Sequence, residues 1–286
     1  MLLPLLKVNF NPVEEFTGFV HNPYVKLPLG MDINKAVIYI WLAAALSIGI
    51  TLLIVRRGLR LRPDGSQTAV EMVYDLCQEQ IARGGLPEEG MRIWFPYVAT
   101  LFVFIWMMNL VGFVPLPFGD RHFSLFGASI PEFQIYAASA NLSVTLALTL
   151  VTFFATHIEG IRYNGVIKYF KSWMPSGLPS PRPLGLKTPA VLVLVGLIGV
   201  IEVLSQLVRI VSLSFRLFFN MLAGHLVIAV FLGLASLLST FFILIVGIPM
   251  GVALYLLEST LIAGLQAFIF ATLSAIYIGG ATHPDH

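Results

Sequence analysis

The stretch IEVLSQLVRIVSLSFRLFFNMLAGH, residues 201–225, is apolar over more than the length of a bilayer and carries polar side chains at helical spacing. These side chains follow one another at steps of three, four, three, four and four residues, which places them on one face of an α-helix. The other faces carry Ile, Val, Leu and Phe. The pattern predicts a membrane-embedded helix with one polar stripe, formed by Glu202, Ser205, Arg209, Ser212, Arg216 and Asn220.

The whole chain has the composition of an integral membrane protein. Of its 286 residues, 57% are hydrophobic and 11% are charged, whereas a soluble domain carries about 25% charged residues. The mean hydropathy is +0.87. The net charge of +2 is too small to indicate a nucleic-acid partner. A single cysteine, Cys77, excludes an internal disulfide and a thiol-rich metal site.

Hydropathy predicts an all-α membrane protein with one extramembrane segment. Residues 1–35 contain four prolines and lack the pattern of a cleaved signal, so we expect a retained N-terminal segment. The remainder, 36–286, is predicted to be a single membrane domain. Each of its last two apolar tracts is either two ordinary spans or one steeply tilted helix, because about 40 helical residues extend near 60 Å. The predicted spans are about 36–55, 94–118, 136–158, 188–234 and 237–281, with an amphipathic helix at about 66–83.

The distribution of cations predicts the orientation in the membrane. The segments 56–92 and 161–187 hold six and five Lys and Arg residues, against three in the N-terminal segment and one in the loop 119–135. The first pair should therefore be cytoplasmic, with the N-terminus outside and the C-terminus cytoplasmic. The membrane is either a bacterial plasma membrane or an organellar inner membrane.

Arg216 requires an anion or a water-filled cavity. An arginine inside a membrane costs about 2.5 to 3.5 kcal/mol, and it does not lose its charge. Glu202 is too distant on the same helix to pair directly. Glu258 and Gln266 are both candidate neighbours, and a carboxylate from another subunit is the interpretation that we favour.

Four segments of the chain resemble signature segments of subunit a of rotary F-type ATP synthases. They are MNLVGFVP (108–115), SANLSVTLAL (139–148), SLSFRLFFNMLAGH (212–225) and GLQAFIFATLSAIY (264–277). Their order and spacing match from about residue 36 to the C-terminus. The resemblance implies a stationary channel subunit beside a rotating c-ring, with protons as the transported ion, the peripheral-stalk b subunits as further partners, and two long, steeply tilted final helices.

The resemblance also implies roles for individual residues. Arg216 matches the essential arginine that faces each ring carboxylate, and Gln266 matches the glutamine near it. A cytoplasmic half-channel and an offset outer half-channel would lead protons to and from the ring. The cytoplasmic one would contain Glu202, Ser205 and Ser212, and the outer one Asn220, His225 and Glu258, helped by Asn109 and Asn141.

The chain departs from the family pattern at three positions. Phe219 replaces the glycine that usually precedes the asparagine of the arginine motif, and Asn141 stands where Asp is common. The family's ionisable residue usually lies seven positions before the glutamine. Here Ser259 occupies that position and the acid is Glu258, which a regular helix would turn away by about 100°.

Structural roles remain alternatives for most of these residues. Arg209 could extend to the membrane interface, and Glu202 could pair with it or serve helix packing. His225 could bond a backbone carbonyl instead of relaying protons. Similar packing roles are open to Ser205, Ser212, Asn109 and Asn141.

No pattern in the sequence indicates an enzyme that acts alone. The chain has no phosphate-binding loop, no nucleophile elbow, and no cluster with metal-ligand spacing, so we expect neither a cofactor nor a nucleotide site. A secondary transporter with Arg216 binding an anionic substrate is the alternative function, and a non-catalytic assembly scaffold is a third. The choice between H⁺ and Na⁺ stays open.

Overall fold

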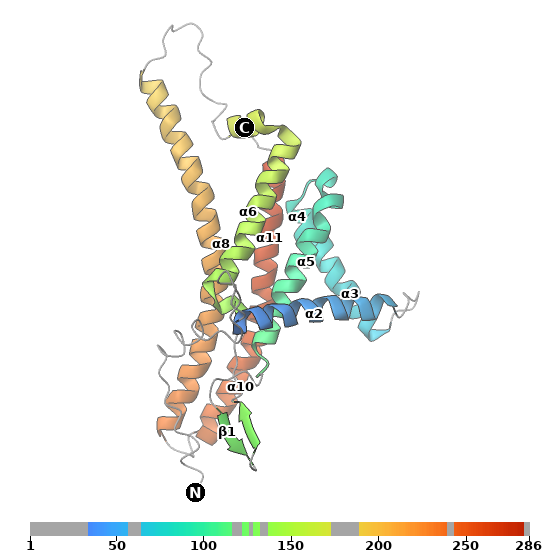
Figure 1. Ribbon diagram of the computed structural model, residues 1–286, viewed down its shortest axis with the longest axis vertical. Helices are drawn as coiled ribbons and strands as arrows, with labels where there is room; N and C mark the ends of the chain where they lie inside the picture. Colours follow the sequence, from blue (N-terminus) through green and yellow to red (C-terminus); the bar gives the residue numbers. More distant parts are fainter. Residues whose placement is uncertain are drawn as a thin grey trace. The chain divides into compact units, whose positions relative to one another are not determined.

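The computed structural model describes residues 34–56, 64–115, 122–125, 128–131, 137–172, 189–238 and 243–282 (Figure 1). The predicted N-terminal segment lies almost wholly outside the described residues, as do the proline-rich loop 173–188 and the C-terminal tail 283–286.

Within the described ranges, five helices are long and apolar enough to cross a membrane, which confirms the all-α membrane class. The first is α2 and the next two are α5 and α6, of 22, 25 and 23 residues. The fourth is α8, and the fifth is a continuous helical run that ends in α11. Their bounds are Lys35–Arg56 for α2, Glu88–Gly112 for α5, Leu142–Asn164 for α6, Pro189–Leu238 for α8 and Ile243–Thr282 for the final run.

Helix α8 is one uninterrupted helix of 50 residues (Figure 1). At 1.5 Å per residue it extends about 75 Å, more than twice the roughly 30 Å hydrocarbon core of a bilayer. The fourth apolar tract is therefore a single helix, not two spans.

The final helical run contains two π-helical segments. It consists of η5 (Ile243–Gly247), α10 (Ile248–Leu256), η6 (Leu257–Ile262) and α11 (Ala263–Thr282). Both η5 and η6 are π-helical, so the rotation of side chains about this helix departs from the regular value of about 100° per residue. The rotation of about 100° between Glu258 and the family position was calculated for a regular helix, so it does not apply across η6.

Helix ends, not hydropathy, fix the limits of α5 and α6. Helix α5 begins earlier than predicted, with Glu88 and Glu89 in its first turn, where carboxylates interact favourably with the helix dipole. Helix α6 begins later, because the Asn141 Oδ1 atom accepts a hydrogen bond of 3.0 Å from the Ser143 backbone N–H. It ends before Gly165, whose φ of 77° suits glycine.

Three shorter features add to the predicted elements. A β-hairpin lies within the predicted loop 119–135, with His122 paired to Pro131 and Leu125 to Ala128. A short helix follows α6. The hairpin strands are β1 (His122–Leu125) and β2 (Ala128–Pro131), the short helix is α7 (Val166–Ser172), and η4 (Ala138–Ala140) is a 3₁₀ turn before α6.

The predicted amphipathic helix is present, with its polarity as expected. It runs through α3 (Gly65–Asp75), the π-helical η3 (Leu76–Ala82) and α4 (Arg83–Gly85). Cys77 and Ile81 are buried, whereas Glu71, Asp75 and Glu79 are exposed. One face of this helix therefore packs against protein while the acidic face remains accessible.

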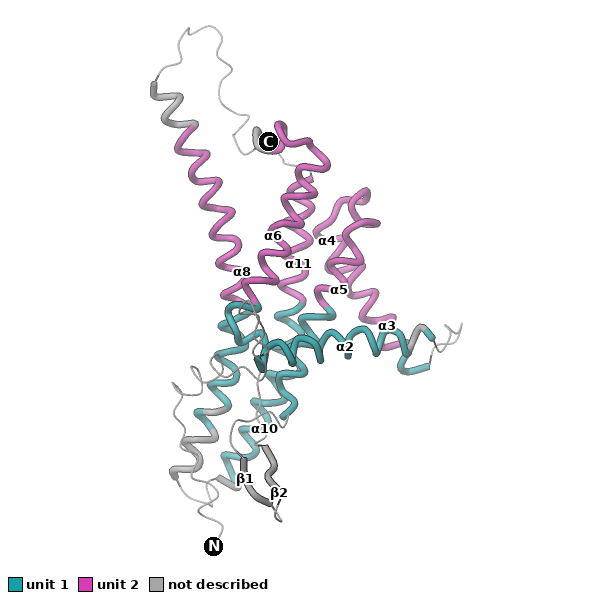
Figure 2. The backbone as a smooth tube through the Cα atoms, in the orientation of Figure 1, with its two compact units in different colours: residues 1–67, 103–144, 217–267 teal, residues 68–102, 145–216, 268–286 magenta. Residues whose placement is uncertain are grey.

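The chain forms two compact units that interleave along the sequence (Figure 2). Unit 1 contains residues 1–67, 103–144 and 217–267, and unit 2 contains residues 68–102, 145–216 and 268–286. In unit 1 the core is built by Phe113, Ala137, Met221 and Ala263. In unit 2 the backbone of Gly85 lies so close to α11 that a Cβ atom on Gly279 would overlap the Gly85 carbonyl oxygen.

Candidate functional site

The polar stripe of α8 lies at the border between the packed and the exposed sides of the helix. Ser205, Ser212 and Arg216 are exposed, while Glu202, Arg209 and Asn220 are partly buried. At about 100° per residue the six side chains occupy a sector of about 80°. The fully buried positions next to this sector are Leu213, Leu217, Met221 and Gly224.

Arg216 is an exposed cation with the polar Ser212 and Asn220 one turn away on either side. Beyond this stripe, the exposed side chains of the same part of α8 are apolar and include Val211, Phe215 and Phe219. The guanidinium group forms no ion pair with a carboxylate of the described residues. The bulky Phe219, which replaces the usual glycine, is 54% exposed and therefore does not separate packed helices of this chain.

Asn220 and Gln266 connect α8 to α11 in unit 1. The Asn220 Nδ2 atom donates a hydrogen bond of 3.1 Å to Gln266 Oε1. Gln266 is buried, and its Nε2 atom has no hydrogen-bond partner among the described residues. The glutamine therefore retains two donor hydrogens for a further ligand.

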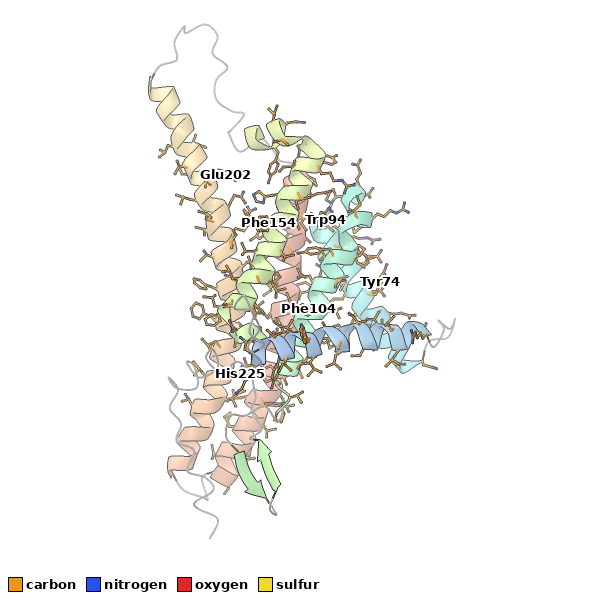
Figure 3. All side chains as sticks on the ribbon, viewed as in Figure 1. Tyr74, Trp94, Phe104, Phe154, Glu202 and His225 are labelled. Atoms are coloured by element: carbon orange, nitrogen blue, oxygen red, sulfur yellow. The ribbon has the colours of Figure 1, made fainter. Side chains whose placement is uncertain are left out.

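His225 lies on α8 in unit 1 (Figure 3). One of its ring nitrogens is engaged and the other has no partner among the described residues. Its Nδ1 atom lies 2.8 Å from the Met221 carbonyl oxygen, and since a carbonyl only accepts, Nδ1 carries a hydrogen. The ring stacks on Phe113 with centroids 5.0 Å apart. The buried Nε2 atom has no partner among the described residues, so it is the nitrogen that can gain and lose a proton.

Glu258 packs against Gly224, the neighbour of His225 in the chain. Its side chain is 5% exposed, and its carboxylate occupies the space that a Cβ atom on Gly224 would need. The Oε1 atom has no hydrogen-bond partner among the described residues. The glycine at position 224, which precedes His225 in the chain, thus makes room for the buried carboxylate of Glu258.

Glu202 belongs to unit 2 and bonds within its own helix. The Gln206 Nε2 atom donates a hydrogen bond of 3.0 Å to Glu202 Oε1. The alternative ion pair with Arg209 is absent from the described residues. The second Glu202 oxygen can still accept from a further group.

The Arg209 side chain lies over an aromatic ring of the same unit. Its guanidinium carbon is 4.3 Å from the ring centroid of Tyr277, a cation–π contact. Both residues line a small, partly open pocket in unit 2. The other polar lining residues are Thr149, Thr152, Thr156, His157 and Gln206.

A row of four buried threonines on α6 was not predicted from the sequence, and three of them, Thr149, Thr152 and Thr156, line this pocket. Thr145, Thr149, Thr152 and Thr156 stand at steps of four, three and four, the same kind of spacing that reveals the α8 stripe. The hydroxyls of the last three donate to backbone carbonyls one turn earlier at 2.8 to 3.2 Å. Threonine is uncharged and common in membrane helices, so this spacing alone gave no reason to single the residues out.

Asn109 and Asn141 are used by the scaffold. The Asn109 Nδ2 atom donates to the Ala263 carbonyl oxygen at 3.3 Å, and its Oδ1 atom accepts from Ser139 Oγ at 2.7 Å. Asn141 caps α6. These contacts favour the packing alternative for both residues. Among the described residues no group of His, Cys, Asp and Glu side chains could hold a metal ion.

Comparison with known proteins assigns the chain to a family. The family described as "ATP synthase A chain" matches residues 37–279. The protein named ATP synthase subunit a of Rubrobacter xylanophilus is 34% identical over 87% of this chain and 84% of its own length. ATP synthase subunit a of Bradyrhizobium diazoefficiens is 36% identical over 87% of this chain and 88% of its own length. That of Afipia carboxidovorans is 33% identical over 96% of this chain and 99% of its own length. The chain therefore belongs to the ATP synthase A chain family, the membrane-sector subunits of F-type ATP synthases, and is a multi-pass bacterial membrane protein.

Proposed function

We propose that this chain is the stator ion channel of an F-type ATP synthase. It conducts protons through two offset half-channels to and from the carboxylates of a c-ring, and so couples the proton-motive force to ring rotation and ATP synthesis. The observation that carries this proposal is the exposed Arg216 in the polar stripe of the otherwise apolar helix α8. Such a cation is costly in a membrane unless an anion from outside the chain meets it.

The guanidinium group suits a transient partner. It stays charged in a low-dielectric environment, and its planar fork of donors fits a carboxylate. A ring carboxylate that arrives ionised is held until the ring moves on. The permanent positive charge also opposes the direct passage of protons from one half-channel to the other.

The residues on either side of Arg216 fit two separate pathways. Glu202 precedes it by 14 residues and His225 follows it by 9, which correspond to about 21 Å and 13 Å along the axis of α8. We assign Glu202, Ser205 and Ser212 to the cytoplasmic half-channel. The outer half-channel contains Asn220, His225 and Glu258, beside Gln266. A polar atom without a partner among the described residues is present in His225, Glu258 and Gln266.

Orientation and partners complete the proposal. The chain lies in a bacterial plasma membrane, with its C-terminus and α3 on the cytoplasmic side and with c-ring and peripheral-stalk b subunits as partners. A membrane-impermeant maleimide should then label a cysteine at the exposed Ser66, in a Cys77→Ala background, in inside-out vesicles and not in right-side-out vesicles. The reverse labelling would invert the orientation.

The experiment that tests the function compares the two arginines of the polar stripe. In vesicles carrying the whole ATP synthase, Arg216→Ala should abolish ATP-driven proton pumping, and Arg216→Lys should be nearly as damaging because a desolvated lysine can lose its charge. The matched control is Arg209→Gln, which removes the arginine that lies over Tyr277 and should leave pumping largely intact.

Assembly is measured in parallel as the amount of c-ring recovered with the chain. Normal pumping by assembled Arg216→Ala would refute the channel function and return the transporter to consideration. Transport of an organic anion by the purified chain without a ring would support the transporter directly.

A further inference from the structure

Glu258 and Gln266 are separated by a π-helical turn. The segment η6 spans Leu257–Ile262, and the Ala263 backbone N–H donates to the Glu258 carbonyl oxygen, five residues back. An α-helical bond would reach back only four residues. The turn therefore contains one residue more than a regular turn.

This additional residue changes which side of the helix Glu258 occupies. In a regular α-helix, eight positions rotate a side chain by about 800°, which leaves Glu258 about 80° away from Gln266. When one π turn absorbs a residue, the eight positions correspond to about seven, and the difference falls to about 20°. The π turn thus returns Glu258 to the side of the helix that Gln266 occupies.

Contacts with α8 agree with this rotation. Gln266 bonds Asn220, and the Glu258 carboxylate packs on Gly224, one turn further along α8. Both side chains therefore face the same helix. A regular helix could not bring both to α8 equally well.

Two hydroxyl groups stabilise the π turn. Ser259 Oγ and Thr260 Oγ1 donate to the Leu256 carbonyl oxygen at 3.4 and 2.6 Å. A π turn disturbs the regular pattern of backbone hydrogen bonds, and Ser and Thr side chains commonly compensate for this in membrane helices. The residues just after Glu258 thus favour the irregular geometry locally.

We infer that η6 is a positioning element that places the Glu258 carboxylate in the outer half-channel beside Gly224 and His225, with Ser259 as the additional residue of the turn. The role of Glu258 in proton conduction rests on the proposed function, but the position of Glu258 relative to Gly224 can be tested separately. Position 259 lies seven residues before Gln266, which is the family's spacing, but its side chain is rotated away from the side of the helix that Gln266 occupies. Position 258 lies eight residues before Gln266, and the π turn places its side chain on that same side.

The geometric test is a crosslink in the assembled ATP synthase. In a Cys77→Ala background, Gly224→Cys is combined either with Glu258→Cys or with Glu258→Ala and Ser259→Cys, because the Glu258 side chain would overlap any side chain at position 224. A short bis-thiol reagent should join 224 to 258 at least five times more efficiently than 224 to 259. Equal crosslinking, or more at 259, would overturn the inference whatever the function of the chain.

The functional test moves the carboxylate by one position. Glu258→Gln should lower passive proton conduction through the membrane sector at least tenfold. Glu258→Ser with Ser259→Glu keeps the composition and adopts the family spacing, and it should conduct as poorly as Glu258→Gln. Deletion of Ser259 should convert the π turn to a regular turn, retain Glu258 seven positions before Gln266, and keep conduction within about threefold of wild type.

The outcomes separate the inference from the proposed function. If Glu258→Gln is inactive but the variant with Glu258→Ser and Ser259→Glu conducts protons at the wild-type level, the positioning role of η6 is overturned and the proposed function is not. Unchanged conduction in Glu258→Gln removes Glu258 from the pathway. If the deletion variant fails to recover with the c-ring, the exchanged variant and the crosslinks still decide, because neither changes the length of the chain.

Discussion

Two adjacent glycines in α11 provide a direct test of the packing in unit 2. A Cβ atom on Gly279 would overlap the Gly85 carbonyl oxygen and lie 3.1 Å from the carbonyl carbon, whereas one on Gly280 would meet no atom within 4 Å. Both substitutions to alanine gain helix propensity, which is worth about 1 kcal/mol. Only Gly279→Ala adds overpacking, which costs about 1 to 3 kcal/mol.

The propensity gain cancels in the difference between the two variants. Gly280→Ala should be up to about 1 kcal/mol more stable than the wild type, and Gly279→Ala about 1 to 3 kcal/mol less stable than Gly280→Ala. The Gly85 group is backbone and cannot rotate away, so the cost should not relax to zero. Unfolding of the purified chain in detergent micelles, followed by tryptophan fluorescence during denaturant titration, measures both values. Equal stability of the two variants would show that Gly85 does not contact α11 as described.

Two further predictions concern single side chains. Burial raises the pKa of the Cys77 thiol to about 11. Maleimide at pH 8 should therefore label Cys77 only when the chain unfolds, while a cysteine at the exposed position of Ser66 should react at once. Because the folded chain retains the thiol proton more strongly than the unfolded chain, the stability that Cys77 contributes is complete below pH 9.0 and declines towards pH 11. Tyr255→Phe removes the hydrogen bond of 2.7 Å to the Phe113 carbonyl and should lower the free energy of unfolding by about 1 kcal/mol, whereas Tyr74→Phe at an exposed position should change it little.

Regular features of the molecule followed from the sequence. Apolar length predicted where the five long apolar helices of the described residues lie, because a bilayer imposes a minimum length on any helix that crosses it. It left open whether each of the last two tracts is one helix or two. The spacing of residues 202 to 220 predicted a narrow polar sector on α8 in the same way. The limits of α5 and α6 were displaced, since hydropathy does not register the Asn141 cap or the acidic first turn of α5.

Irregular features did not follow, for a physical reason in each case. The rotation of Glu258 about its helix could not be calculated from the sequence, because a constant 100° per residue does not hold across a π turn. The close approach of Gly85 to Gly279 depends on a contact between residues far apart in the chain. The position of Arg209 over Tyr277 likewise depends on tertiary packing, and without it extension of the side chain to the interface was an equally reasonable interpretation.

Unused hydrogen-bonding capacity separates the scaffold from the proposed pathway. Asn109 and Gln266 are both buried amides, and a sequence gives no means of ranking them. Asn109 uses its amide nitrogen and its oxygen in fixed bonds to Ala263 and Ser139, so exchanging either of these partners would break a buried bond, at a cost of about 1 to 3 kcal/mol. Gln266 uses only its oxygen, and its amide nitrogen can meet water or a passing carboxylate at no such cost. A side chain that must exchange partners once for every transported proton has to resemble Gln266, and we therefore place Asn109 among the residues that hold the channel wall instead of those that conduct.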